Sequence, residues 1–586
     1  MEPSTNGFGR SASFGLLRTI DLAAILAVVM PTLLAFNLPP SSTFFNQAAA
    51  LLGWGAFVAA LSLVVSWPGQ ARRRELLLLL VPMGVLAVEA AISVGINGLP
   101  SSLGLSAIGI LLAAGVATLA GAASRESDSA SEVFRAFCIA LVGAGFLGAT
   151  IGCIQILLPD WAQGAWIAAA PADGRASGNL RQPNHLSSLL VWAIVALTWL
   201  AQSRVIRPLY ALPVGLFFVF GIVLTGSRTG LLDFGLLTVW ALIDRRLPTR
   251  VRIGLGSSLL VYWALWWAMA DWAHAMHATF GGEARMGMQG DISSSRYGIW
   301  RDTWQLILQH PWFGVGWGEF NFAWSLTPFP HRPVAFFDHT HNIALQFAVE
   351  LGLPLAAVLM LFLLAGLACV FLNGQRADPG VSAMVRTTFM IVLTIGVHSM
   401  LEYPLWYSYF LLPTGFAFGF GLAGSPCPAK TEGASPRPSS RRLGVMAILL
   451  MLGGAGALLD YHRVSVIFEA GDGTSLADRI ARGKRSVFFA YHANYAAATT
   501  AARPADAMAA FPSATQNLLD TRLMMAWAKA YAERGDVERA RHLAERLREF
   551  HNEDSADFFA PCEEEAQPVP FQCDKPTRAM DYRDFK

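Results

Sequence analysis

Two histidines, His339 and His341, lie two residues apart at the end of the longest polar stretch of the chain, which runs from Asp271 to Asn342. A neutral imidazole accepts a proton from a hydroxyl group near neutral pH, and a well-placed general base accelerates a reaction by about 100- to 10,000-fold. The chain becomes apolar again at Ile343, directly after this stretch. The pattern points to a general base at the end of a loop that re-enters a membrane.

Two other interpretations of the histidine pair stay open. In an extended segment, His339 and His341 share a face, and with Asp338 they have the side chains of a metal site. No third and fourth ligand is evident in the sequence, so we expect neither a metal ion nor another cofactor. Both imidazoles could also have a structural role.

Three arginines, two of them next to apolar runs and one in the long polar stretch, are candidate ligands for a phosphate. Arg181 lies in the segment from Gly178 to His185, which also contains Asn184, and Arg228 and Arg296 follow further along the chain. The planar guanidinium group stays charged and makes bidentate contacts with phosphate oxygens. The alternatives are an interfacial cap for the 178–185 segment and, for Arg228, a side chain that reaches the lipid headgroups. Combined with a base, the arginines suggest transfer from a phosphate-bearing lipid to a hydroxyl group.

Two more polar side chains lie beside or within apolar runs. Glu350 is costly inside a membrane and is a candidate site residue, although a hydrogen bond between helices explains it equally well. Glu402 belongs to the segment His398 to Tyr407, whose aromatic residues fit an interfacial belt.

The surrounding elements are apolar. The chain has 586 residues, 54% hydrophobic and 14% charged, whereas a soluble domain carries about 25% charged residues. Runs of roughly 20 apolar residues recur, which predicts an all-α, polytopic membrane protein. No cleavable signal peptide is evident, so the first run is interpreted as a retained span. The thirteen expected spans are 19–37, 45–66, 75–95, 103–123, 134–157, 185–203, 208–226, 229–243, 253–270, 343–372, 387–401, 404–424 and 443–459.

The basic residues predict the orientation. Lys and Arg gather in alternate short loops, whereas loops 37–44 and 96–102 are nearly free of them, so the N-terminus is predicted to be cytoplasmic. The loops 158–184, 227–228 and 271–342 and the tail after residue 459 are then outside. Arg181, Arg228 and Arg296 fall on the side that should be poor in arginine, and an anionic ligand is one explanation.

This orientation divides the chain into regions. We expect a cytoplasmic N-terminus (1–18), membrane bundles (19–270 and 343–424), a large outside loop (271–342), a cytoplasmic linker (425–442), a last span (443–459) and an outside helical domain (460–586). Inside that domain, Thr521 to Phe550 resembles one tetratricopeptide-type hairpin, and a generic helical tail is an equal alternative. Outside the cytoplasm, Cys562 and Cys573 are expected to form a disulfide.

The large loop has its own local pattern. The spacing of Arg296, Trp300 and Trp304 predicts an amphipathic helix against the membrane. Glycines at 314, 316 and 318 allow a tight backbone path. They do not form a dinucleotide fingerprint, because no strand precedes them.

These motifs resemble a known family. The set Arg296, Trp300, Pro311 to Gly318, His341-Asn342 and Glu350 to Pro354 is similar to the O-antigen ligase/polymerase superfamily of bacterial inner-membrane glycosyltransferases. The segments Gly178–His185 and His398–Tyr407, with the helical tail, look most like its PglL-type protein O-oligosaccharyltransferase branch. The resemblance covers residues 130–425 well and the earlier spans by topology only.

The resemblance implies a GT-C-like bundle of about 12–13 transmembrane helices with a large periplasmic loop and a helical periplasmic C-terminal domain. It implies inverting, metal-independent transfer of a preassembled glycan from undecaprenyl pyrophosphate to Ser or Thr hydroxyls of periplasmic proteins. By motif position, His341 is the expected base, His339 the second choice, and Arg228 and Arg296 the diphosphate ligands. The remaining expected substrate-binding residues are Arg181, Asn184, His185, Asn342 and Glu402.

Other functions remain open at this stage. Within the superfamily, the alternatives are ligation to lipid A–core and polymerisation of repeat units. Outside it, a transporter of lipid-linked glycans would need charges near the mid-membrane on repeated spans, and no such repeat is evident. Membrane lipids are expected to surround the protein, and nucleic acid is not an expected partner.

Overall fold

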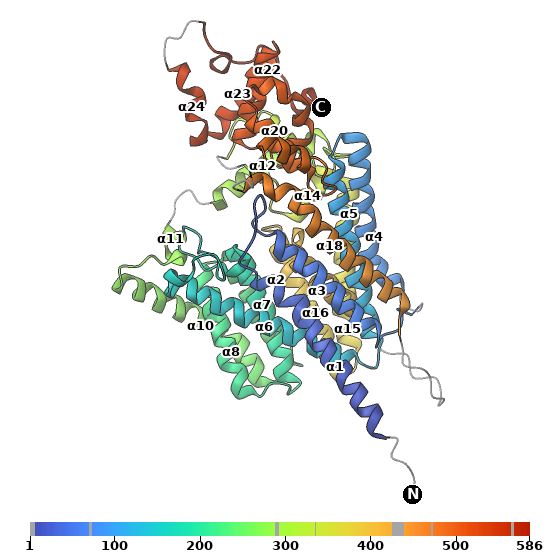
Figure 1. Cartoon of the computed structure of the whole chain (residues 1–586). Helices are drawn as coiled ribbons and strands as arrows, with labels where there is room; N and C mark the ends of the chain where they lie inside the picture. Colours follow the sequence, from blue (N-terminus) through green and yellow to red (C-terminus); the bar gives the residue numbers. More distant parts are fainter. Residues whose placement is uncertain are drawn as a thin grey trace. The chain divides into compact units, whose positions relative to one another are not determined.

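The regular elements of the chain are helices (Figure 1). The computed structural model describes residues 6–69, 73–287, 292–333, 336–424, 439–469, 473–563 and 568–586, and no strand occurs among them. The prediction of an all-α fold is confirmed. The cytoplasmic linker expected at 425–442 lies mostly outside the described residues.

The chain divides into two compact units. The first unit comprises Met1–Val81, Leu112–Met288 and Phe362–Gly456, and the second comprises Pro82–Leu111, Gln289–Leu361 and Ala457–Lys586. Most of the polar loop and the whole C-terminal tail, which the sequence separates by more than 100 residues, therefore fold into the same unit.

Ten helices among the described residues are long and apolar enough to cross a membrane, so the protein is a multi-pass membrane protein. Their bounds are α3 Phe44–Ser62, α4 Arg73–Ile92 (continued as a π-turn through Asn97), α5 Ser101–Arg125, α6 Ala130–Leu157, α7 Pro183–Gln202, α8 Pro208–Thr225, α10 Thr249–Ala275, α15 Leu353–Arg376, α16 Pro379–Ser399 and α18 Arg441–Phe468. Shorter apolar helices are α9 Arg228–Ile243 and α17 Ser408–Leu422.

Three expected spans are not single helices, and in one of them, 404–424, a 3₁₀ turn (Pro404–Trp406) precedes α17. In the span expected at 19–37, helix α1 (Asn6–Val28) gives way to a four-residue helix, α2 (Met30–Leu33), which contains Pro31. The expected span 343–372 breaks at Gly352 into α14 (Ile343–Leu351) and α15. Predicting one continuous helix there was wrong.

The break at Gly352 has a steric cause. Gly352 has φ +82°, and a Cβ atom there would lie 2.2 Å from the carbonyl oxygen of Trp312, so no other residue fits without a shift. The amide of Leu353 donates to the carbonyl of Pro311 (2.8 Å) and so begins α15 on the polar loop. The apolar run 343–372 therefore contains a loop-bound helix followed by a candidate span.

The glycine-rich segment after Trp312 packs directly on α14. Gly314 has φ +67°, and a Cβ atom there would lie 2.4 Å from the carbonyl oxygen of Glu350. The amides of Val315 and Gly316 donate to the carbonyls of Val349 (2.8 Å) and Glu350 (3.0 Å). The predicted tight backbone path is confirmed, and it fixes α14 by its C-terminal end.

The core of the first unit surrounds α7. Every residue from Pro183 to Leu200 is buried, and α6, α8, α9 and α16 pack against this helix. The indole of Trp192 donates to the carbonyl of Ile391 on α16 (3.0 Å). A helix that is buried on all sides is a core element, so the N-terminal residues of α7 are surrounded by packed neighbours.

The tail of the second unit contains the expected helical hairpin. Helices α22 (Thr521–Glu533) and α23 (Val537–Phe550) are capped by Asp520 and Asp536, and Gly535 makes the turn with φ +83°. Two shorter helices, α19 (Leu476–Gly483) and α20 (Ala490–Thr500), precede the hairpin.

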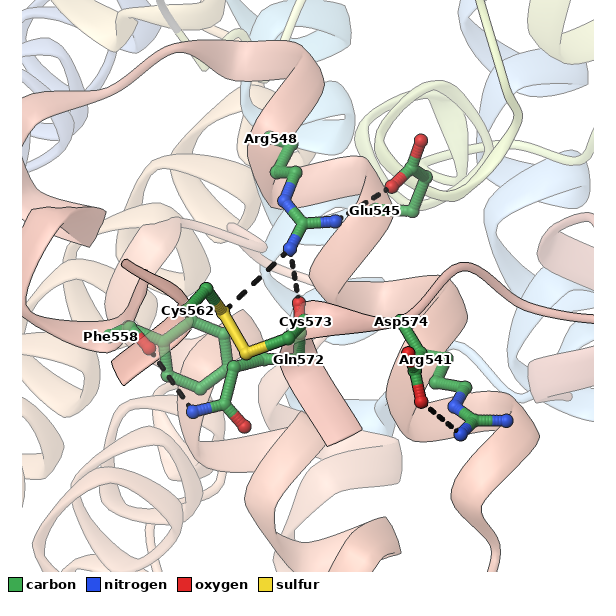
Figure 2. The surroundings of a disulfide bond; sticks show 8 residues. All are labelled: Arg541, Glu545, Arg548, Phe558, Cys562, Gln572, Cys573 and Asp574. Atoms are coloured by element: carbon green, nitrogen blue, oxygen red, sulfur yellow. Dashed lines mark hydrogen bonds and ion pairs between the residues drawn. A yellow bond between two sulfur atoms is a disulfide. The ribbon is translucent and has the colours of Figure 1, made fainter. Parts of the chain in front are cut away.

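Cys562 and Cys573 form the expected disulfide, 11 residues apart in sequence (Figure 2). Figure 2 shows Arg548 of α23 donating to the carbonyl of Gln572 beside the disulfide and pairing with Glu545 (3.2 Å). Arg541 pairs with Asp574 (2.6 Å). Two arginines of α23 therefore hold the chain at the second cysteine, one residue before it and one residue after it.

Candidate active site

Arg296 lies on α12 (Ile292–Gln309), one turn before Trp300, so the helix expected around these residues is confirmed. The side chain of Arg296 is half-buried. Helix α12 packs against α14 and against α13 (Phe320–Leu326), a short helix whose residues are all buried. Arg296 is therefore carried by a helix that is packed inside the second unit.

The segment before α14 is fixed by hydrogen bonds around Thr340. The indole of Trp300 donates to the carbonyl of Thr340 (2.8 Å), and the amide of Thr340 donates to Oε1 of Gln346 (2.8 Å). The hydroxyl of Thr340 donates to the carbonyl of Asn342 (2.8 Å). Thr340 is fully buried, so the two histidines that flank it have defined backbone positions.

Asn342 caps α14. Its Oδ1 atom accepts from the amides of Ala344 (3.1 Å) and Leu345 (3.0 Å). The residue expected to bind substrate therefore has a structural role that is visible in the fold. It sets the start of the helix directly after His341.

His341 has a left-handed backbone conformation with φ +54°. Residues other than glycine rarely adopt it, and it costs of the order of 1 kcal/mol. The side chain is half-buried, with the ring of Phe337 edge-on at 5.4 Å. The backbone of His341 lies in a hydrogen-bonded segment, and part of its imidazole is accessible. Both features suit a general base, which must point at the proton that it accepts.

His339 pairs with Asp338 across 2.8 Å from Nδ1 to Oδ1. Loss of solvent around Asp338 raises its pKa, but the charge and hydrogen bond of His339, together with a backbone hydrogen bond and the charge of His341, lower it below its usual value. An anionic partner at Nδ1 orients the His339 ring.

Within the described ranges, no group of three His, Cys, Asp or Glu residues is arranged to hold a metal ion.

In the first unit, Arg228 is the first residue of α9. Ser227 caps this helix by accepting from the amide of Gly230 (3.0 Å), and its hydroxyl donates to Oδ1 of Asn184 (2.7 Å). The amide nitrogen of Asn184 donates to Oε1 of Glu402 (3.0 Å). This chain of contacts fixes the end of α9 that carries Arg228.

A second group of buried polar side chains lies one residue further along α7. Nδ1 of His185 contacts the hydroxyl of Tyr409 (3.1 Å), and the hydroxyl of Ser188 contacts Nδ1 of His398 (2.7 Å). The exposed fractions of His185 and His398 are 3% and 0%. Both imidazoles therefore interact with the protein interior.

Arg181 differs from these buried residues. It is exposed, has φ +59°, and donates from a terminal nitrogen to the carbonyl of Ala35 (2.6 Å). This bond fastens the turn before α7 to the segment after α2. The guanidinium group remains on the surface of the first unit.

The predicted site residues thus form two groups, one in each unit. The first unit holds Arg181, Asn184, His185, Arg228 and Glu402, and the second holds Arg296, His339, His341 and Asn342. Asn184, His185 and Glu402 are at most 7% exposed and bonded to protein atoms, which gives them a part in holding α9 and α7.

Sequence reasoning missed several residues that build these groups. Ser227 could have been found, because a serine directly before a helix start is a capping signal. Trp300 belongs to the predicted helix and to the motif set that resembles the family, and nothing in the sequence indicates its bond to Thr340. The same holds for Gln346 and for Ser188, whose partners are distant in the sequence or belong to the loop.

Three protein families match parts of this chain, and the matched ranges include the candidate site residues. Residues 213–360 match the O-antigen ligase family, residues 387–562 match the C-terminal region of the virulence factor membrane-bound polymerases, and residues 176–201 match the protein glycosylation ligases. The last match covers Arg181, Asn184 and His185, and the first covers Arg228, Arg296 and both loop histidines.

The chain is similar to two O-oligosaccharyltransferases from Acinetobacter baylyi. A general O-oligosaccharyltransferase is 25% identical over 449 residues, which are 73% of this chain and 74% of the relative. A ComP-specific O-oligosaccharyltransferase is 24% identical over 265 residues, 44% of this chain and 46% of the relative. The chain is a membrane glycosyltransferase related to the O-antigen ligases and the O-oligosaccharyltransferases.

Proposed function

We propose that this protein transfers a preassembled glycan en bloc from undecaprenyl pyrophosphate to Ser or Thr hydroxyl groups of periplasmic proteins. The observation that carries the proposal is the similarity to a general O-oligosaccharyltransferase along 449 residues, most of both chains. The match of residues 176–201 to protein glycosylation ligases supports a protein acceptor independently.

In the proposed reaction, His341 is the general base. It takes the proton of the acceptor hydroxyl as that oxygen attacks the anomeric carbon of the glycan. The bond from that carbon to the diphosphate breaks, and undecaprenyl diphosphate leaves with the bonding electrons. One displacement inverts the anomeric centre, and the step needs no metal ion. The strained, half-buried position of His341 supports this assignment.

We assign diphosphate binding to arginines, of which Arg228 belongs to the first unit and Arg296 to the second. Arg228 occupies the first position of α9, where the helix dipole adds positive potential for an anion. Arg296 is carried one turn before Trp300 on packed helix α12. Neutralising the leaving group and aligning the acceptor would supply most of the acceleration. Arg181 is a further candidate because its guanidinium is exposed.

The proposed location is the bacterial inner membrane, with a cytoplasmic N-terminus and a periplasmic loop and tail. The disulfide between Cys562 and Cys573 supports an oxidising compartment for the tail. The distribution of arginines among the short loops supports the same orientation.

Two other acceptors are the main competitors. The matches to O-antigen ligases and to membrane-bound polymerases favour transfer to lipid A–core or to a growing repeat-unit chain. These reactions have the same donor chemistry and differ in the acceptor hydroxyl. Transport of a lipid-linked glycan without transfer is the third outcome to be separated by experiment.

The test compares the His341→Ala variant with wild type, using a purified lipid-linked glycan and a protein acceptor. We expect glycan transfer to be lost while binding of the lipid donor is kept. His331→Ala is the matched control, because His331 is an exposed imidazole in the same loop. Full transfer activity of the His341→Ala variant would overturn the assignment of the base, and His339→Ala would then be examined in the same assay.

A further inference from the structure

Helix α13 contacts both the segment that carries the histidines and the C-terminal tail. It begins just after the glycine-rich path, and its N-terminal neighbour Glu319 is fully buried. Helices α12, α14 and α23 pack against it, as does the 582–585 turn. All these elements belong to the second unit.

One side chain on α13 joins the loop to the tail. The amide nitrogen of Asn321 donates to the carbonyl of Phe337 (2.8 Å), and its amide oxygen accepts from the backbone amide of Leu519 (2.8 Å). Asn321 is 4% exposed, so both bonds lie in the interior, where an unmade bond is costly. The asparagine side chain provides both the donor and the acceptor for these two bonds. An ionised aspartate of the same size provides acceptors only.

A second connection between loop and tail is Arg332. Its guanidinium group donates to the carbonyls of Trp324 (2.6 Å) and Thr327 and pairs with Glu549 of α23 (3.1 Å from Nε). The same group lies over the rings of Trp324, at 4.9 Å, and Phe550, at 4.7 Å. The Arg332 side chain is fully buried, so this loop residue is joined to the tail in the protein interior.

A third connection involves the C-terminal end of α13. Nε2 of His542 lies 2.8 Å from the carbonyl of Leu326, and His542 is 1% exposed. Leu519, His542, Glu549 and Phe550 all belong to the tail, and each contacts α13 or the segment directly after it. The tail therefore contacts α13 at Asn321, Trp324 and Leu326 and contacts Arg332 beyond it.

The supported segment leads directly to the proposed base. Phe337 receives the Asn321 bond through its carbonyl, and its ring contacts the ring of His341. On the other side, Thr340 is held by Trp300 and Gln346. The segment from Phe337 to His341 is thus bonded on both sides, and the side chain that bonds Phe337 also accepts from Leu519 of the tail.

We propose that the C-terminal helical domain is a structural part of the catalytic machinery and that Asn321 is the positioning residue through which it holds the His341 segment. This inference rests on the proposed role of His341. It predicts that the tail sets the turnover number, whereas a tail that only captured the acceptor protein would set KM.

The test uses the full-length protein with Asn321→Asp. The carboxylate keeps the acceptor for Leu519 and loses the donor for Phe337. Asn494→Asp is the matched control, because Asn494 is an asparagine of the tail whose side-chain nitrogen donates to other tail residues, Ser513 (3.1 Å) and Ala490 (3.3 Å). Glu549→Gln is a second variant that weakens the Arg332 connection while keeping the side-chain shape.

Three quantities are measured for each variant: kcat, KM for the acceptor, and hydrogen exchange of the backbone amides of Thr340 and Asn342. For Asn321→Asp we expect about a tenfold fall in kcat, an unchanged KM and at least tenfold faster exchange. The ratio of variant to wild-type kcat should rise as the pH is lowered, because a protonated carboxyl group can donate to Phe337 again. Glu549→Gln should show a smaller change of the same kind.

Unchanged exchange in Asn321→Asp and Glu549→Gln would overturn the inference, as would faster exchange with an unchanged kcat. A rise in KM alone would also overturn it and assign the tail to acceptor capture. If wild type transfers no glycan to any protein, the proposed acceptor is wrong. The kcat is then measured with lipid A–core or a repeat-unit acceptor. Hydrogen exchange, which needs no acceptor, still tests whether Asn321 and Glu549 hold the His341 segment.

Discussion

The indole nitrogen of Trp300 donates to the carbonyl oxygen of Thr340 across 2.8 Å and ties the helix that carries Arg296 to the residue before His341. Arg296 lies one helical turn before Trp300, and His341 lies one residue after Thr340. A candidate anion ligand and a candidate base are thus connected through one side chain. Changes at Trp300 should therefore disturb transfer without touching either residue.

Replacing Trp300 with Phe removes this bond and keeps an aromatic ring. One hydrogen bond contributes about 0.5–1.5 kcal/mol, so we expect kcat to fall about three- to tenfold with little change in the unfolding temperature. Trp304→Phe is the control, because Trp304 is exposed one turn further along α12. Equal kcat values for the two variants would contradict the positioning role of Trp300.

Replacing Arg296 with Lys keeps the charge but removes the planar fork that binds two phosphate oxygens. We expect weaker donor binding by about 1.5–3 kcal/mol, measured by titration with the lipid-linked glycan. Arg301→Lys serves for comparison, since Arg301 pairs with Asp302 inside the same helix. If Arg296→Lys binds the donor with wild-type affinity, Arg296 does not make a bidentate contact with the phosphate oxygens.

The contact between Asn184 and Glu402 can be tested by exchanging donor and acceptor. Asn184→Asp places two carboxyl groups 3.0 Å apart in the buried network and should destabilise the protein by about 2–4 kcal/mol. In the double variant Asn184→Asp, Glu402→Gln, the glutamine can donate to the aspartate, so much of the stability should return. Additive losses in thermal unfolding would show that these two side chains do not depend on each other.

His542 gives the connection between tail and loop a pH dependence. Burial, with a smaller contribution from Arg546, lowers the pKa of His542 to about 4 from its ordinary 6.5. Because the unfolded state binds the proton more readily, stability is fully present above pH 6.5 and is lost as the pH falls towards 4. This residue should contribute on the order of 3 kcal/mol across that range.

The readout is limited proteolysis of the second unit between pH 7.5 and 5. His492, whose pKa burial lowers to about 3, should contribute a second loss of the same sign, so His542→Gln should remove only part of the slope. An unchanged slope in His542→Gln would refute the contribution of this imidazole.

Most of the fold could be predicted from the sequence, because each pattern that was used depends on residues that are close together along the chain. Apolar runs predicted the candidate spans, the glycines at 314–318 the tight path, and the spacing around Trp300 helix α12. The break at Gly352 was missed, because the run 343–372 is apolar on both sides of it. The signal was nevertheless present, since a glycine at the end of a helix with Pro354 two residues later is a stop pattern.

The site was predicted less completely because its contacts are distant in sequence. Asn184 was interpreted as a ligand for substrate, whereas its partner Glu402 lies 218 residues away and both are buried. Asn321 carried no signal, because its partner Leu519 lies 198 residues further along the chain. A single sequence identifies polar residues beside spans but does not show which polar residues bond each other.

The most direct measurement of the central claim is a competition between acceptors. Purified protein is supplied with an undecaprenyl pyrophosphate-linked glycan and with an acceptor protein, lipid A–core and a repeat-unit acceptor, and all products are analysed by mass spectrometry. We predict that a Ser or Thr of the acceptor protein gains the mass of the whole glycan and that His341→Ala abolishes this gain. Transfer to lipid A–core or to the repeat unit alone would contradict the account.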